Sequence, residues 1–231
     1  VALNNYKQLF EIRATNNWFN FFAVNVKLFN FNNSIEFNFI HNWMNLINET
    51  INDYTITRKL YNTINSITYL ASCSHGKVCF KVLKNTVNPA NIENECKLLK
   101  QINHPHIIRS IDIFDWEGHK IITMPFAEGG DLFELIDKHS PIDEVTAAQI
   151  MYSAFSAIDH LHSMGISHRD IKPENFLLMD ENLEYIKLVL CDLGYAKQYS
   201  PGEKESTEFL GTQYYMAPEL LQQQPCMYFS L

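Results

Sequence analysis

The octet His168-Arg169-Asp170-Ile171-Lys172-Pro173-Glu174-Asn175 places three kinds of polar chemistry within one short segment. Asp170 can accept a proton, Lys172 carries a positive charge suited to a phosphate, and Asn175 offers an amide oxygen that a metal ion can take as a ligand. The alternative for such a segment on its own is a polar connection between a helix and a strand. Motifs elsewhere in the chain decide between the two interpretations.

Two later motifs keep a fixed order with the octet. Asp192-Leu193-Gly194 begins seventeen residues after Asn175, and Gly211-Thr212-Gln213-Tyr214-Tyr215-Met216-Ala217-Pro218-Glu219 follows it. With three motifs in this order, the chain resembles eukaryotic protein kinases of the serine/threonine type, although Leu193 stands where Phe is usual. The resemblance leans toward the calcium/calmodulin-dependent-like branch. It implies an α+β, bilobal fold with a small antiparallel sheet lobe plus one helix, and an incomplete helical lobe.

Composition divides the chain at about residue 52. Residues 1–52 are rich in Asn and Phe and contain neither Gly nor Pro. One interpretation of this stretch is a low-complexity extension, and the other is an aromatic-rich docking segment for a partner. Residues 53–231 are expected to form the kinase domain, with a sheet lobe over 53–127 and part of a helical lobe over 128–231. Because similar kinases continue with several more helices, the resemblance implies a C-terminally truncated domain.

Charge and cysteine content narrow the classes of partner. The 231 residues include 26 acidic and 18 basic side chains, which give a formal net charge of −8. This balance disfavours nucleic acid or an anionic membrane as the main partner. The most apolar stretch, Trp18 to Phe31, is interrupted by polar residues and is a poor membrane span. Five cysteines without paired spacing are expected to be reduced thiols, which favours a cytoplasmic location.

Hydrophobic periodicity predicts a sheet-rich half followed by helices. Strands are expected over residues 54–57, 67–70 and 77–83, and a strand pair over 107–114 and 119–124 around a turn at 115–118. Helices are expected over residues 91–101, 131–138 and 146–163, with Asp131 as an N-terminal cap. In the longest helix, the spacing predicts a buried stripe made of Ala147, Ile150, Met151, Ala154, Ile158 and Leu161.

The resemblance implies a nucleotide site in the sheet-rich half and along its edge. Lys81, in Val78-Cys79-Phe80-Lys81, matches the strand lysine that grips the α- and β-phosphates of ATP, and Glu95 matches the helix glutamate that holds this lysine. Taken alone, Lys81 would be interpreted as an ordinary exposed strand lysine. The nucleoside part of ATP is expected to contact Thr68, Met124, Ala127, Asp131 and Leu177, with Asp131 at the ribose.

Phosphoryl transfer depends on positioning and charge neutralisation more than on covalent chemistry. By resemblance, Asp170 orients the hydroxyl of a protein substrate, and Lys172 neutralises charge on the γ-phosphoryl group. Asn175 and Asp192 hold Mg²⁺, a cation that prefers oxygen ligands. Thr212 is expected to hydrogen-bond both Asp170 and Lys172. The implied function is therefore ATP- and Mg²⁺-dependent phosphoryl transfer to Ser or Thr hydroxyls of protein substrates.

Glu208 occupies the common position of an activating phosphosite, three residues before Gly211. We expect its carboxylate to pair with Arg169 and partly replace a phosphate there. Activity without phosphorylation of this segment follows, with Ser206 and Thr207 as alternative phosphosites. The other interpretation is that Glu208 is one exposed acid among several in the segment.

The glycine-rich loop of similar kinases lacks its glycines in this chain. Tyr61, Thr63 and Ser66 stand at the three expected positions. Glycine lets a backbone approach phosphates closely, so these side chains predict weaker nucleotide binding or a loop held further from the phosphates. The departure supports an alternative function, that of a pseudokinase or truncated kinase fragment acting as a nucleotide-binding or scaffold module.

Overall fold

An antiparallel sheet with the strand order β1-β2-β3-β4-β6-β5 forms the first half of the described chain. The computed structural model describes residues 46–199, 205–206, 208–224 and 226–227. The chain divides into two units, 1–46 and 47–231, and every described helix and strand belongs to the second. The strands of the sheet are β1 (Thr50–Ile51), β2 (Tyr54–Asn62), β3 (Ser66–Cys73), β4 (Gly76–Leu83), β5 (Asp112–Trp116) and β6 (His119–Pro125).

The β5–β6 hairpin differs from its prediction at both ends. Its turn consists of Glu117 and Gly118 alone, both with positive φ (47° and 77°), as a two-residue hairpin turn requires. At the other end, β5 starts at Asp112, so the strand predicted from residue 107 is wrong over its first half. Ile107 instead forms an isolated bridge with Leu190. Consecutive buried residues at 107 and 108 do not fit the alternation of a strand that buries only one face.

Three helices carry the caps that fix where they begin. The helix α4 (Pro89–Gln101) starts two residues before its prediction, because the Asn88 side chain accepts from the Ala90 N–H and Pro89 fills the first turn. The helix α5 (Leu132–His139) begins after Asp131, whose carboxylate accepts from the Glu134 N–H, so the predicted cap is confirmed. Asp143 caps α6 (Glu144–Ser163) in the same way.

The core joins α4, α5 and α6 to the short strands between them. Of the predicted stripe on α6, Ile150, Ala154, Ile158 and Leu161 are buried. Met151 is 47% exposed, so its assignment to the core is wrong. Ser153 and Ala157 are also buried on this face, and α6 packs against β9. The elements packed against α6 decide which of its residues are buried, and the periodicity of the sequence does not reveal those elements.

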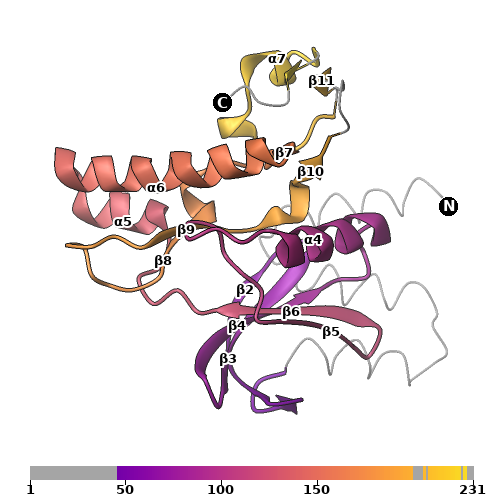
Figure 1. Ribbon diagram of the computed structural model, residues 1–231. Helices are drawn as coiled ribbons and strands as arrows, with labels where there is room; N and C mark the ends of the chain where they lie inside the picture. The colour runs from indigo at the N-terminus through magenta and orange to yellow at the C-terminus, as the bar shows by residue number, and fades with distance from the viewer. Residues whose placement is uncertain (1–45, 200–204, 207, 225, 228–231) are drawn as a thin grey trace, which may run out of the picture. The chain divides into compact units, whose positions relative to one another are not determined.

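Short strands outside this sheet form the pairs β7 (Ile166–Ser167) with β10 (Lys197–Gln198), β8 (Phe176–Leu178) with β9 (Leu188–Leu190), and β11 (Glu205–Ser206) with β12 (Cys226–Met227). The short helical turns are η1 (Pro173–Asn175), η2 (Leu193–Tyr195), η3 (Gln213–Tyr215) and α7 (Pro218–Leu221). The short strands β8 and β9 lie between the sheet and the helices α5 and α6, whereas β11 and α7 lie beyond α6, at the top of the view (Figure 1). A sheet with one helix, followed by a helical part, confirms the predicted α+β fold. The predicted domain boundary at residues 52 and 53 stays a prediction.

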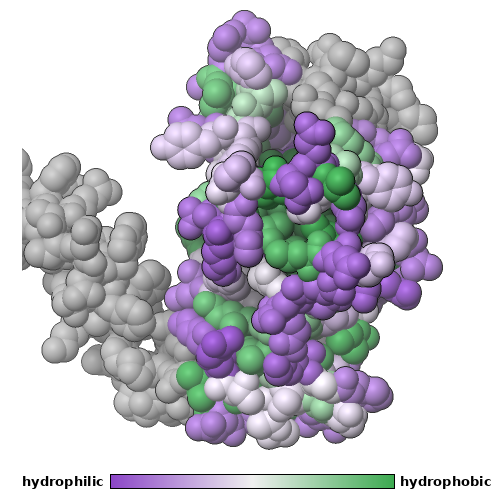
Figure 2. Space-filling model, turned by 90° about the vertical axis from the view of Figure 1, so that its left-hand side faces the viewer, coloured by the Kyte–Doolittle hydropathy of each residue, from purple (hydrophilic) through white to green (hydrophobic). Residues whose placement is uncertain are grey.

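The helical part leaves apolar surface in contact with solvent. Figure 2 shows apolar side chains gathered at the level of α5 and α6 and ringed by polar ones. Exposed apolar residues on these helices include Phe133, Ile136, Val145, Tyr152 and Phe155. Among the described residues, no helix combines the length and the apolar character that crossing a bilayer requires.

Candidate active site

Strand register gathers three of the sequence-selected side chains, together with Cys79, on one face of the sheet. Thr68 of β3 lies opposite Lys81 of β4, and Cys79 of β4 lies between Leu70 of β3 and Met124 of β6. Opposite residues of antiparallel neighbours share a face, and so do residues two apart along a strand. Thr68, Lys81, Cys79 and Met124 therefore point to the same side of the sheet.

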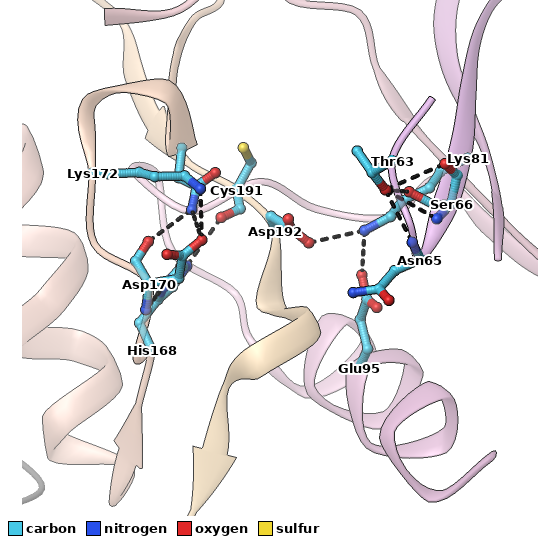
Figure 3. A network of polar contacts seen from close by, with 11 residues as sticks. Thr63, Asn65, Ser66, Lys81, Glu95, His168, Asp170, Lys172, Cys191 and Asp192 are labelled. Atoms are coloured by element: carbon cyan, nitrogen blue, oxygen red, sulfur yellow. Dashed lines mark hydrogen bonds and ion pairs between the residues drawn. The ribbon is translucent and has the colours of Figure 1, made fainter. Parts of the chain in front are cut away.

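Lys81 joins the sheet to α4 and to the segment after β9. Its Nζ lies 2.8 Å from Glu95 Oε1 and 2.9 Å from Asp192 Oδ1 (Figure 3). Burial alone would lower the pKa of Lys81, but the charges of Asp192 and Glu95 outweigh it and raise the pKa. The charge of Lys81 in turn lowers the pKa of Asp192 to about 2. One cation thus pairs with two carboxylates, and its charge keeps the Asp192 carboxylate ionised at neutral pH.

A second polar cluster surrounds Asp170. Its Oδ1 accepts from the Thr212 N–H at 2.9 Å and from the Thr212 hydroxyl at 2.7 Å. Its Oδ2 faces Lys172 Nζ at 2.9 Å and Asn175 Nδ2 at 3.0 Å. Burial alone would raise the pKa of Asp170, but the hydrogen bonds from Thr212, Lys172 and Asn175 outweigh it and lower the pKa. Asp170 is therefore a buried, ionised carboxylate held in one orientation.

His168 links the two clusters through the backbone. The Asp170 N–H donates to its Nδ1 at 3.3 Å, so the proton of the neutral ring is on Nε2, which donates to the Cys191 carbonyl at 3.0 Å. The ring is buried, and this burial lowers the pKa of His168 and keeps it neutral. It fixes the spacing between the segment of Asp170 and the segment that carries Asp192.

Strained backbone conformations occur beside both clusters. Arg169 and Asp192 adopt left-handed conformations, with φ of 67° and 61°, which cost free energy in residues other than glycine. Gly211 has φ of 115°, and a Cβ there would lie 2.6 Å from the Arg169 carbonyl oxygen. Only glycine lets Thr212 approach Asp170 this closely. Strain of this kind persists where the surrounding contacts over-determine the conformation, which is typical of functional sites.

Glu208 lies between two cations. Its carboxylate contacts Arg169 Nη1 and lies 3.2 Å from Lys197 Nζ. Hydrogen bonds from Arg169 and Lys197 lower the pKa of Glu208. Arg169 Nε also donates to the Tyr195 carbonyl at 2.6 Å, which anchors the guanidinium. The predicted contact with Arg169 is present. Lys197 was missed, because no motif marks it. The side chains of Ser206 and Thr207 lie outside the described part of the chain.

The residues selected for the nucleoside are divided between the sheet and the helical part. Met124 is on β6, and Ala127 follows in the connection to α5. Asp131 caps α5 and forms an isolated bridge with Leu177 of β8. The backbone thus brings Asp131 and Leu177 side by side, whereas Met124 lies with Lys81 on the sheet. The roles of these residues in binding stay predictions.

The chemistry of Asn175 and Asp192 fits Mg²⁺. Asn175 Nδ2 donates to the carbonyl and the carboxylate of Asp170, which turns the amide oxygen away from those bonds. The Asp192 side chain is ionised and 47% exposed. Magnesium takes one or two protein oxygen ligands and completes its shell with water and phosphate. In the described ranges no group of three or more His, Cys, Asp or Glu side chains is placed to hold a metal.

Comparisons with known proteins agree with this geometry. Residues 54–229 match the protein kinase domain family. The calcium/calmodulin-dependent protein kinase cmkA of Emericella nidulans is 37% identical to the chain over 157 residues, which are 67% of this chain and 38% of that protein. The chain thus matches less than half of the length of this relative. The family match covers most of the chain, including both polar clusters. The chain therefore belongs to the eukaryotic protein kinase family and is similar to its calcium/calmodulin-dependent, serine/threonine-specific branch.

Proposed function

We propose that the chain transfers the γ-phosphoryl group of ATP, with Mg²⁺, to Ser or Thr hydroxyls of protein substrates. The observation that carries the proposal is the pair of charge clusters, Lys81 with Glu95 and Asp192, and Asp170 with Lys172 and Asn175. Phosphoryl transfer needs fixed charges on both the donor and the acceptor side. The two clusters supply them, and His168 holds their segments in register.

The cluster around Asp170 suits an incoming hydroxyl. Lys172 Nζ donates to the Thr212 hydroxyl at 2.7 Å, and this hydroxyl donates to Asp170 Oδ1. A carboxylate held this way can accept a hydrogen bond from a substrate hydroxyl without moving, and it can take the proton as the hydroxyl attacks. Lys172 stays beside the phosphate oxygens to neutralise their charge. Asp170 is the residue that touches the reacting hydroxyl.

The cluster around Lys81 suits the nucleotide phosphates. Lys81 would contact the α- and β-phosphates while Glu95 fixes its direction. Asn175 and Asp192 would hold Mg²⁺, which neutralises phosphate charge when bound. Thr68, Met124, Ala127, Asp131 and Leu177 would contact the nucleoside. A cytoplasmic location, favoured by the unpaired spacing of the five cysteines, belongs to the same proposal.

Phosphoryl transfer by the full chain tests the proposal. The chain is incubated with γ-labelled ATP, Mg²⁺ and three peptide pools that differ only in a Ser, Thr or Tyr acceptor. We expect label in the Ser and Thr pools, none in the Tyr pool, and loss of label in Asp170→Asn. A thermal shift with ATP and Mg²⁺ is measured in parallel. A shift without transfer would favour the scaffold alternative, and neither shift nor transfer would overturn the proposal.

A further inference from the structure

The turn between β2 and β3 is closed by its own side chains. This turn, Asn62–Ser66, is called the hairpin tip below and stands where similar kinases have their glycine-rich loop. Asn62 pairs with Ile67, and the Thr63 N–H donates to the Ser66 carbonyl at 2.9 Å. The hairpin tip is therefore a tight, hydrogen-bonded turn without a glycine.

The Thr63 hydroxyl occupies the backbone amides of the hairpin tip. Its Oγ1 accepts from the Asn65 N–H at 3.3 Å and from the Ser66 N–H at 3.1 Å. Figure 3 shows these bonds beside Lys81, which is on the neighbouring strand β4. Threonine side chains readily form such local bonds to neighbouring backbone groups. Two consecutive donors of the hairpin tip thus already have an acceptor within the turn.

Lys84 holds the hairpin tip against the end of β4. Its backbone N–H donates to the Asn65 carbonyl at 2.9 Å, and its Nζ donates to Asn62 Oδ1 at 2.9 Å and to the Thr63 carbonyl. Burial lowers the pKa of Lys84, and the neighbouring charge of Lys59 adds to this effect. One residue, Lys84, therefore donates hydrogen bonds to the carbonyls of both Thr63 and Asn65. The turn cannot open toward a ligand without breaking these bonds.

Consecutive backbone N–H groups bind a phosphate only when they are free to point at it. In the hairpin tip, a neutral hydroxyl oxygen takes the place that an anionic phosphate oxygen would fill. A phosphate that enters must displace Thr63 Oγ1 from Asn65 and Ser66, and the free energy of these bonds is subtracted from its affinity. The two cations of the site, Lys81 and Lys172, are not affected by this competition.

We propose that Thr63 limits the affinity of the site for nucleotide phosphates, because its hydroxyl competes with them for the amides of Asn65 and Ser66. The proposal rests on the function proposed above. Thr63 is then a specificity-determining residue, because its hydroxyl lowers the affinity for triphosphates and leaves the affinity for the nucleoside unchanged. The wild-type chain therefore discriminates weakly between ATP and adenosine, and removing one oxygen atom strengthens that discrimination.

Calorimetric titration of the full chain with ATP and Mg²⁺, and separately with adenosine, tests this role. Thr63→Val keeps the shape of the side chain and removes the hydroxyl, and Thr63→Ser keeps the hydroxyl as the matched control. We expect Thr63→Val to bind ATP roughly tenfold more tightly, the effect of one to two hydrogen bonds between neutral groups. Thr63→Ser should bind ATP like wild type, and all three should bind adenosine equally.

Two results overturn the inference. One is a Thr63→Val chain that binds adenosine normally but ATP no more tightly than wild type. The other is an equal gain in affinity for ATP and adenosine, which would mean that the whole site has changed. If Thr63→Val melts early, Thr63→Ala removes the same hydroxyl, keeps the Cβ and must show the same selective gain. A wild-type chain that binds neither ligand would overturn the proposed function itself, a different outcome from both.

Discussion

The segment around Asp170 and the hairpin tip face the same proposed ligand and are built in opposite ways. Around Asp170, four hydrogen bonds from Thr212, Lys172 and Asn175 converge on one buried carboxylate. In the hairpin tip, Thr63 satisfies the amides of its own turn. The polar groups of the first region converge on a residue of the site, whereas those of the hairpin tip form hydrogen bonds within the turn.

The difference teaches which parts of the site depend on side-chain identity. The charged residues can act only as the residues they are, because a carboxylate or an ammonium has no neutral equivalent there. The hairpin tip would contribute backbone donors, and any nearby hydroxyl can satisfy a backbone donor. A sequence can therefore keep its catalytic charges while the loop over the phosphates forms its hydrogen bonds within itself.

The largest effect is expected from a substitution that breaks the Asp170 cluster and lowers the rate of phosphoryl transfer. Asp170→Asn keeps the shape of the side chain but removes the acceptor charge, so we expect phosphoryl transfer to fall by about 10²- to 10⁴-fold, the usual contribution of a general base. The initial rate of label transfer from ATP measures this loss. Thr63→Val is the control from the other region and should transfer at least as fast as wild type. A small loss in Asp170→Asn, below fivefold, would contradict the role of this residue.

The next effect concerns stability at Lys81. Lys81→Met leaves Glu95, 5% exposed, without its cation, and removing one partner of a buried pair costs about 3–5 kcal/mol. Lys77→Met removes an exposed lysine from the same strand, paired with Glu128, and should cost about 0–1 kcal/mol. Urea unfolding of both variants measures the difference. Equal losses would show that Lys81 and Glu95 do not form a buried pair in solution.

A smaller effect is expected at Glu208. Glu208→Ala removes the carboxylate between Arg169 and Lys197, so transfer should fall about tenfold without any change in the phosphorylation of the chain. Glu205→Ala removes the same charge from the same segment and should have no effect. Rates are measured on chains shown to be unphosphorylated by intact mass. Unchanged turnover in Glu208→Ala would mean that Glu208 is only one exposed acid among several.

The smallest effect is a pH dependence set by Asp192. Its pKa lies at about 2 in the fold and 3.8 ordinarily, so its ion pair with Lys81 stabilises the fold fully above the ordinary value. This contribution is lost as the pH falls through the folded pKa. Asp192→Asn should be less stable than wild type at pH 5, and the gap should close toward pH 2. A gap of the same size at both pH values in urea unfolding would contradict the ion pair.

The sequence by itself predicted the family, the α+β fold and most element types. The motifs at 168–175, 192–194 and 211–219 supplied the family, because each contains several residue types at fixed spacing. Caps at Asp131 and turn residues such as Gly118 follow from local backbone chemistry. Where the predictions were wrong, as in the strand from residue 107 and the buried position of Met151, packing partners outweighed local periodicity.

The tertiary structure alone decided which distant groups meet. Lys81 and Asp192 are 111 positions apart, and only the fold puts their charges 2.9 Å from each other. No motif marks the ion pair between Lys197 and Glu208 or the hydrogen bonds that the Thr63 hydroxyl accepts from the amides of Asn65 and Ser66. The physical reason is the distance along the chain over which each kind of interaction acts. Spacing along a chain fixes torsion angles and caps over a few residues, whereas hydrogen bonds and ion pairs form between whichever groups packing brings into contact.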